Sequence, residues 1–388
     1  MKESQISRRC KTIVPFYVMD LLARAKALEA EGRSIIHMEV GEPDFVTPPP
    51  VIEAGKQALD SGRTGYTPAT GIPELRHAVA EYYQTRYNIS VPASRIIITP
   101  GASGALQLIL AALINPGDEL LLTDPGYPCN KNFVEFFSGV PVAVSVGPDS
   151  EYQLNSAMLE QHWSERTCGA LVATPSNPTG TIVPKVEMAA IHETVTRRGG
   201  SLIVDEIYQG LIYDNPGYSA LEISDEVMVI NSFSKYFGMT GWRLGWLVVP
   251  EQFVDSIDCL AQNIFLSCSA PAQYAALASF RPENIEILEA RRQEFKARRD
   301  FLLPALRELG FDIPVSPQGA FYLYANCANL TDDSFAFCYE LLEAEGVAVT
   351  PGKDFGVNEP EHHLRFAYTT RIEVMEEAVN RIRRFLSR

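Results

Sequence analysis

The chain has 388 residues, of which 46% are hydrophobic and 21% are charged, and its formal net charge is −15. This length predicts two domains rather than one small core. The acidic balance argues against binding to nucleic acid or to an anionic membrane surface. The longest strongly apolar run, residues 105–114, is too short to span a bilayer.

Cysteine and histidine usage predicts a reducing cytoplasm and no metal site. The seven cysteines are scattered and form no Cys-x-x-Cys pair, which is typical of free thiols. The six histidines show no spacing typical of zinc ligands. The first ten residues are polar and no apolar core follows them, so we expect no signal peptide.

The N-terminal residues 1–50 are predicted to form a segment that packs on a small C-terminal domain. Met1 to Lys11 is polar and basic and predicts a mobile tail. Apolar residues at helical spacing predict a helix over residues 17–30, which ends before Gly32. Residues 35–40 predict a short strand, which a Gly-Glu-Pro-Asp-Phe turn starting at Gly41 interrupts.

Residues 51–281 predict a large α/β domain. Two helical segments, 51–59 and one that ends at Tyr87, come first. Apolar strands then alternate with helical segments, which implies a mostly parallel sheet with crossover helices. The polar groups that follow these strands fall where open α/β sheets bind ligands. The predicted strands are 96–99, 119–122, 170–173, 202–204, 227–230 and 247–249.

Residues 282–388 predict a smaller α+β domain. A long charged helix begins at Pro282 and runs through Leu306. The segments that follow predict strands over 319–324, 347–350 and 364–367, and helices over 334–345 and from residue 372.

One lysine loop, Asn231 to Trp246, stands out chemically. It reads Asn-Ser-Phe-Ser-Lys-Tyr-Phe-Gly-Met-Thr-Gly-Trp-Arg-Leu-Gly-Trp and lies between two apolar runs. Ser232, Ser234 and Arg243 are groups that can hold a phosphate, and the amine of Lys235 lies among them in sequence. This combination predicts a phosphorylated aldehyde held as a Schiff base, which is the chemistry of pyridoxal phosphate. An exposed lysine in an ordinary loop is the alternative.

This segment resembles the lysine motif of the class I/II aminotransferases, the fold type I pyridoxal-phosphate enzymes of the aspartate aminotransferase superfamily. The resemblance extends from about Pro15 to the C-terminus. It implies transfer of an amino group from an L-amino acid to a 2-oxo acid such as 2-oxoglutarate or pyruvate, in amino acid metabolism or biosynthesis. Lys235 would hold the cofactor and then act as general base and acid.

Two further segments provide candidate cofactor contacts. Small residues between a strand and a helix, Gly101, Ala102 and Ser103, predict either an anion site or a tight turn. The resemblance assigns this loop to the cofactor phosphate, together with Ser232, Ser234 and Arg243. It implies that Tyr127 stacks on the pyridine ring, although a structural turn tyrosine fits equally well.

The resemblance also assigns the polar edge of the ring. Asn177 and Tyr208 would hydrogen-bond the 3′-oxygen, and Asp205 would keep the pyridine nitrogen protonated. An aspartate at the end of a buried strand can instead cap a following helix.

The substrate carboxylate has three candidate partners. Arg365 lies on an otherwise apolar strand, where a buried charge needs an anionic partner. A structural salt bridge is the general explanation. The resemblance makes Arg365 the bidentate clamp for the substrate carboxylate, aided by Asn177 and the backbone at Gly41.

The preference for one substrate side chain over another is predicted from Ser103. In the aspartate-preferring relatives that the chain resembles, a lysine in the phosphate loop helps to recognise the acidic side chain, and the matching position here is Ser103. Neutral or aromatic donors are therefore expected over acidic ones. The walls of the side-chain pocket are predicted to be Phe16, Tyr17, Ile264 and Phe265.

Tyr66 lies in a Gly/Pro loop where a tyrosine is usually a packing residue. The resemblance implies instead a homodimer in which Tyr66 reaches the partner's cofactor phosphate. Two other functions remain open: a pyridoxal-phosphate C–S lyase on the same fold, and a non-enzymatic regulator built on it. The regulator is disfavoured because Lys235 and Asp205 are present and no DNA-binding domain precedes Pro15.

Overall fold

A seven-stranded sheet forms the centre of the computed structural model, which describes residues 6–7, 9–13 and 15–388. The strand order is β2-β8-β7-β6-β5-β3-β4. Only β8 runs antiparallel to its neighbours, so the predicted mostly parallel sheet is confirmed. The strands of this large sheet are β2 Ile96–Thr99, β3 Glu119–Asp124, β4 Val140–Ser145, β5 Thr167–Ala173, β6 Ser201–Asp205, β7 Met228–Ser232 and β8 Gly245–Val248.

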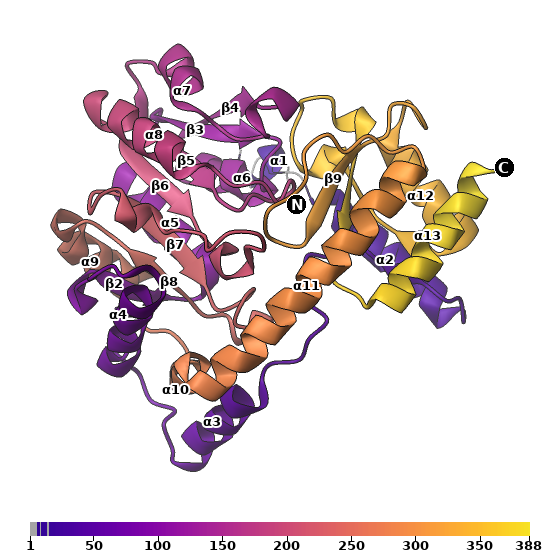
Figure 1. The fold of residues 1–388 in the computed structure, drawn as a ribbon. Helices are drawn as coiled ribbons and strands as arrows, with labels where there is room; N and C mark the ends of the chain where they lie inside the picture. Colours follow the sequence, from indigo (N-terminus) through magenta and orange to yellow (C-terminus); the bar gives the residue numbers. More distant parts are fainter. Residues whose placement is uncertain (1–5, 8, 14) are drawn as a thin grey trace.

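Helices cover both faces of the large sheet (Figure 1). Successive strand residues point to opposite faces, so Ile97 joins the core under α5 and α9, and Ile96 joins the core with α4 and α8. Burial on both faces explains why the inner strands read as continuous apolar runs. The helices before α11 are α1 Arg9–Thr12, α2 Tyr17–Ala30, α3 Pro49–Asp60, α4 Pro73–Tyr87, α5 Gly101–Leu113, α6 Pro128–Phe136, α7 Ser156–His162, α8 Lys185–Arg197, α9 Val254–Ile264 and α10 Ala270–Leu277.

The C-terminal residues build a second, small sheet of three antiparallel strands in the order β11-β12-β9. Arg365 on β12 lies opposite Tyr324 on β9 and opposite Thr350 on β11. The remaining elements are β9 Tyr322–Asn326, β10 Val347–Ala348, β11 Thr350–Pro351, β12 His363–Ala367, α11 Pro282–Glu308, α12 Ser334–Glu345 and α13 Ile372–Leu386.

The N-terminal segment is paired with the C-terminal part of the chain. Strand β1, Ile36–His37, runs parallel to β10, and it is shorter than the predicted strand 35–40. The predicted helix over 17–30 is confirmed as α2. The predicted tail, Met1 to Lys11, lies partly outside the described residues. Its described end contributes to the short helix α1.

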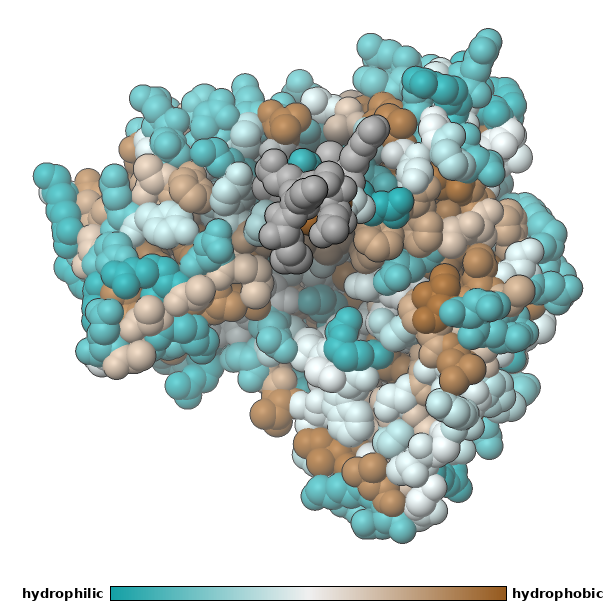
Figure 2. Space-filling model, turned by 180° about the vertical axis from the view of Figure 1, so that it is seen from behind, coloured by the Kyte–Doolittle hydropathy of each residue, from teal (hydrophilic) through white to brown (hydrophobic). Residues whose placement is uncertain are grey.

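The outer surface is mixed in character. Hydrophilic residues predominate on the face shown in Figure 2, and hydrophobic residues form separate groups between them. Within the described residues, no helix combines the length and apolar character that crossing a membrane requires. Likewise, no group of three or more His, Cys, Asp or Glu side chains in this part of the chain is placed to hold a metal ion.

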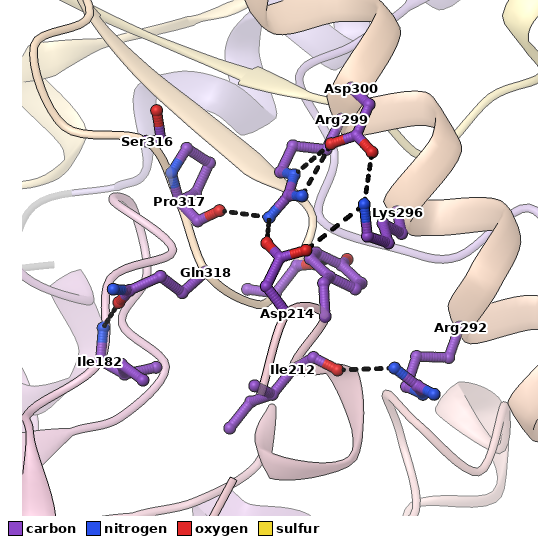
Figure 3. Close-up of polar contacts among 12 residues, drawn as sticks. Ile182, Ile212, Asp214, Arg292, Lys296, Arg299, Asp300, Ser316, Pro317 and Gln318 are labelled. Carbon is purple, nitrogen blue, oxygen red and sulfur yellow. Dashed lines mark hydrogen bonds and ion pairs between the residues drawn. The ribbon is translucent and has the colours of Figure 1, made fainter. Parts of the chain in front are cut away.

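Helix α11 connects the two sheets and is tied to both sides by charged groups (Figure 3). Buried Arg299 donates from Nη1 to Asp214 Oδ2 at 2.6 Å and to Pro317 O at 2.9 Å, and from Nη2 to Asp300 Oδ1 at 2.7 Å. Lys296 Nζ lies 3.3 Å from Asp214 Oδ1 and 2.6 Å from Asp300 Oδ2. Asp214 lies between β6 and β7 of the large sheet and Pro317 precedes β9, so one guanidinium joins both parts.

We expect Arg299→Met to lower the free energy of unfolding by about 2–4 kcal/mol, because it leaves Pro317 O and the Asp214 carboxylate without their buried donor. Urea denaturation measures this loss. Arg198→Met is the matched control, since Arg198 pairs with Glu160 at the surface and its removal should cost at most about 1 kcal/mol. Equal midpoints for the two variants would contradict a structural role for the Arg299 cluster.

Candidate active site

A cavity of about 600 Å³ lies at the edge of the large sheet where the parallel strands end. These carboxyl ends meet at one edge, which is why residues far apart in sequence converge. The predicted site residues that line it are Gly41, Ala102, Ser103, Tyr127, Asn177, Asp205, Tyr208, Ser232, Ser234, Lys235, Arg243 and Arg365.

One corner of the cavity is a cradle of hydroxyls and backbone N–H groups. Gly101 has a φ of +73°, which favours glycine, and a Cβ there would lie 2.7 Å from Arg243 Nη2, so a larger residue would also push the guanidinium aside. Arg243 itself has a φ of +54°, a conformation that a residue other than glycine adopts at a cost. Ser232 Oγ donates to Ser234 Oγ at 3.0 Å beside them. Together with the N-terminus of α5, these donors form a site for an anion.

Lys235 occupies the loop after β7 and is not the exposed lysine of the alternative interpretation. Its Nζ donates to Gly41 O at 2.7 Å and lies 5.8 Å from the centroid of the Tyr208 ring. Burial lowers the pKa of Lys235 to about 8, and the charges of Arg365 and Arg243 act in the same direction. The amine is therefore far easier to deprotonate than a surface lysine, which is what a nucleophile requires.

Asp205 ends strand β6 and faces the same cavity. Burial raises the pKa of this carboxyl to about 6, while the Ile207 N–H and Lys235 lower it. Its Oδ1 accepts from Ile207 N at 3.1 Å, so it closes a turn before the 3₁₀ helix 209–211 and caps no α-helix. The neighbouring Tyr208 hydroxyl lies 2.8 Å from that of Tyr322.

Arg365 is a buried guanidinium with only 5% of its surface exposed. Nη1 donates to Asn177 Oδ1 at 2.8 Å and Nη2 donates to Glu39 O at 2.6 Å. Among the described residues no carboxylate forms an ion pair with it, and its Nε has no partner. The structural salt bridge is therefore not found in this part of the chain, and a buried positive charge is left for an anion in the cavity.

Comparison with known proteins agrees with this geometry. The family model for aminotransferases of class I and II matches residues 33–382. The chain belongs to this family.

Two relatives and one solved structure show how far the similarity extends. The aminotransferase is 36% identical to (5-formylfuran-3-yl)methyl phosphate transaminase of Methanocaldococcus jannaschii, over 99% of this chain and 100% of the relative. It is 37% identical to valine–pyruvate aminotransferase of Mycobacterium tuberculosis, over 95% and 96%. A crystal structure of an aminotransferase from M. tuberculosis superposes with a TM-score of 0.95 at 37% identity, covering 98% of this chain and 99% of that one.

Members of this family depend on pyridoxal phosphate, and the residues present fit that group. The Gly101–Arg243 cradle matches a phosphate, and a Cβ at position 101 would close it. Asp205 is a partly buried carboxyl without an ion-pair partner among the described residues, as a pyridine nitrogen would require. Lys235 supplies an amine of lowered pKa in the same cavity.

Not every predicted residue lies in the cavity of the aminotransferase. Tyr66 is 85% exposed, in the loop between α3 and α4, and does not line the site. Phe16 is in the wall as predicted, but Tyr17 packs edge-on against Phe335 with ring centroids 5.3 Å apart. Ile264 and Phe265, at the end of α9, also lie outside the cavity.

Sequence reasoning missed the groups that hold the wall formed by α2. The Asp354 carboxylate accepts from the N–H groups of Tyr17 at 2.7 Å and Val18 at 2.8 Å, which fixes the start of α2 at the cavity. Tyr322 and Phe355 lie under the Arg365 guanidinium, with ring centroids 4.4 Å and 4.8 Å from its Cζ. Alternate residues of a strand share one face of the sheet, so the strand pattern around Arg365 could have indicated which side chains lie beside it.

His37 links α2 to the backbone beside Arg365. Its Nδ1 lies 2.6 Å from Glu39 Oε1 and its Nε2 lies 3.1 Å from Glu29 Oε1. The hydrogen bond to Glu39 raises the pKa of His37, and Glu29 adds to this effect although burial opposes it.

A raised pKa in the folded state means that His37 contributes stability at low pH. This contribution is full below the pKa of the unfolded chain, and it is lost as pH rises through the folded pKa. We expect His37→Gln to lower the denaturation midpoint at about pH 6 and to have a much smaller effect at about pH 9. His77→Gln is the control. A destabilisation by His37→Gln that does not change with pH would contradict the charged bridge.

Proposed function

We propose that this aminotransferase prefers a neutral or aromatic L-amino acid as donor and a 2-oxo acid such as 2-oxoglutarate or pyruvate as acceptor. The observation that carries this proposal is the charge of the cavity. Among its described lining residues only Lys235, Arg243 and Arg365 are cationic. The cofactor aldehyde, the cofactor phosphate and the substrate α-carboxylate would take these three, so none remains for a second carboxylate.

The rest of the cavity supports the same preference. Phe16, Val18, Met19 and Leu22 form an apolar wall along the start of α2. The Asp354 carboxyl also lines the cavity, and a negative side chain would be repelled there. The M. tuberculosis relative is named for valine, a neutral donor, whereas the M. jannaschii relative is named for a furan phosphate. The family match alone therefore does not select the donor.

The proposed residue roles follow from position. Bound pyridoxal phosphate supplies an electron sink that makes the substrate Cα–H acidic. Arg243, the serine hydroxyls and the α5 N-terminus would bind the phosphate, and Tyr127 would stack on the ring. Asp205 would hold the proton of the pyridine nitrogen, and Tyr208 and Asn177 would hydrogen-bond the 3′-oxygen. The residues assigned to the phosphate are Gly101, Ala102, Ser103, Ser232, Ser234 and Arg243, with Tyr66 from the partner.

Two cationic side chains are proposed to act on the substrate: one binds its carboxylate and the other transfers its proton. Arg365 binds the α-carboxylate through its planar fork, with Asn177 and the backbone at Gly41 beside it. Lys235 would act as general base and acid, taking the proton from the substrate Cα and returning it to the neighbouring carbon. Its pKa of about 8 suits both directions near neutral pH.

A single substitution tests the preference for neutral donors. Ser103→Lys places a cation in the cavity and should raise kcat/KM for aspartate, relative to that for alanine or phenylalanine, on the order of 10- to 100-fold. Ser103→Met, of similar length and without charge, should not produce this change. If the unmodified enzyme already turns over aspartate faster than every neutral donor, the proposal is wrong.

The quaternary and domain organisation are part of the proposal. We propose an N-terminal segment 1–50, a large domain 51–281 and a small domain 282–388, since the seven-stranded sheet falls within 51–281 and the three-stranded sheet within 282–388. We further propose a homodimer in the cytoplasm, in which Tyr66 reaches the partner's cofactor phosphate. The exposure of Tyr66 and of the nearby apolar Leu59 supports an interface there.

A further inference from the structure

A second cavity of about 270 Å³ lies between the two sheets and has no part in the proposed reaction. One side comes from the segments that follow β3 and β4 of the large sheet, and the other from β9, β12 and the turns next to them. The lining residues are Pro125, Val146, Gly147, Pro148, Tyr152, Asp312, Pro314, Tyr324, Asn326, Asn358, Glu359 and His363.

Three buried aromatic rings form the core of this cavity. His363 stacks on Tyr324 with ring centroids 4.7 Å apart and planes 5° apart. Tyr152 and Tyr324 form a T-shaped pair with ring centroids 5.9 Å apart. Aromatic rings attract cations through their π faces, most strongly where water is partly excluded.

His363 presents an unused hydrogen-bond acceptor. The side chain is 7% exposed, and its Nδ1 lies 2.9 Å from Glu359 O. A carbonyl oxygen can only accept, so Nδ1 carries the hydrogen and Nε2 keeps a lone pair in the neutral ring. Burial lowers the pKa of His363, which keeps the ring neutral. Within the described residues Nε2 has no hydrogen-bond partner, although the side chain lines the cavity.

The charges around these rings are negative. The described lining residues include two carboxylates, Asp312 and Glu359, and no lysine or arginine. Burial raises the pKa of Tyr152 to about 12, and the charges of Asp312 and Glu359 contribute to this rise. Both carboxylates therefore act on the aromatic end of the cavity.

We infer that this second cavity binds a small organic ammonium ion. The ammonium N–H donates to His363 Nε2, its charge is balanced by Asp312 and Glu359, and its alkyl groups lie against Tyr152 and Tyr324. A carboxylate or phosphate ligand is disfavoured because no cation lines the described wall.

The proposed site is adjacent to the substrate pocket. His363 and Arg365 are two positions apart on β12, and Tyr324 and Tyr322 are two apart on β9, so each pair shares a face of the small sheet. Phe355 lies between the two cavities, 4.8 Å from Arg365 Cζ and 6.0 Å from the Tyr324 ring. An ammonium ion on Tyr324 and His363 would thus be one side chain away from the substrate-binding arginine.

The test uses the holoenzyme and protonated N,N-dimethylbutylamine, a tertiary amine that cannot condense with the cofactor aldehyde. Titration calorimetry and the thermal midpoint report its binding. Hexanoate and 1-pentanol are the anionic and neutral probes of similar size. Asp312→Asn/Glu359→Gln removes two exposed charges, and Asp332→Asn/Glu340→Gln is the matched control with the same net charge outside the cavity. His363→Phe keeps the stacked ring without the acceptor.

We expect saturable binding of the amine with a raised thermal midpoint, and no binding of hexanoate or 1-pentanol. Affinity should fall at least about tenfold in His363→Phe and in Asp312→Asn/Glu359→Gln, and remain unchanged in the control. Absence of amine binding to the unmodified holoenzyme would overturn the inference. Equal affinity in all variants, or equal binding of hexanoate, would also overturn it.

Discussion

Lys235→Ala is expected to abolish steady-state transamination, with kcat reduced on the order of 10⁴-fold. The reason is that one amine performs both tasks that the reaction requires. In the proposed mechanism it would hold the cofactor and move the proton between the substrate Cα and the neighbouring carbon. Burial lowers the pKa of Lys235 to about 8, and its loop faces a cavity with Arg243 and Arg365. Coupled assays of 2-oxo acid formation measure the loss.

A second readout separates catalysis from cofactor binding. Borohydride reduction of the unmodified holoenzyme, followed by peptide mapping, should place the phosphopyridoxyl group on Lys235. Lys56→Ala, an exposed lysine on α3, is the control and should keep full activity. Activity in Lys235→Ala above one per cent of the control would contradict the assignment, as would a label on another lysine.

Arg365→Lys is expected to lower kcat/KM on the order of 100-fold, mainly through KM. Lysine keeps the charge but lacks the planar fork that binds a carboxylate at two points. The variant also lacks the two hydrogen bonds that position the Arg365 guanidinium, to Asn177 Oδ1 at 2.8 Å and to Glu39 O at 2.6 Å. Arg365 is buried without an ion-pair partner among the described residues, so the substrate carboxylate is its expected counter-ion.

Steady-state kinetics with one donor over a range of concentrations measure this effect. Arg384→Lys on the surface of α13 is the matched control and should leave KM unchanged, since the Arg384 side chain is exposed to solvent and lies outside the cavity. An unchanged KM in Arg365→Lys would show that another group binds the α-carboxylate. The salt-bridge interpretation of Arg365 would then need a partner that the described residues do not provide.

The fold and most of the candidate site were predictable because both depend on local sequence patterns. Buried parallel strands read as apolar runs, and polar residues such as Asp205 and Asn177 follow them directly. Once several strands are parallel, their ends must meet at one edge, so convergence of these residues follows without further information. The helices 17–30 and 334–345 were equally clear, since apolar spacing and terminating glycines mark both.

Other features depend on contacts between distant segments. Strand β4 was missed because Pro141 interrupts its pattern, and an edge strand tolerates a proline that a central strand would not. The turn of Tyr17 away from the cavity depends on Asp354, more than 300 residues further along the chain. The second cavity joins the segment up to Tyr152 to His363, and no motif links them. Only the packing of one sheet against the other determines such sites.

The central claim is transamination with a preference for neutral donors, and a half-reaction panel tests it most directly. The holoenzyme is mixed with single amino acids without a 2-oxo acid acceptor, and cofactor absorbance, 2-oxo acid and ammonia are followed together. We predict bleaching of the cofactor, one 2-oxo acid released per site, no ammonia, and faster reaction with alanine or an aromatic amino acid than with aspartate. Continuous release of ammonia without bleaching would contradict this account and identify a lyase.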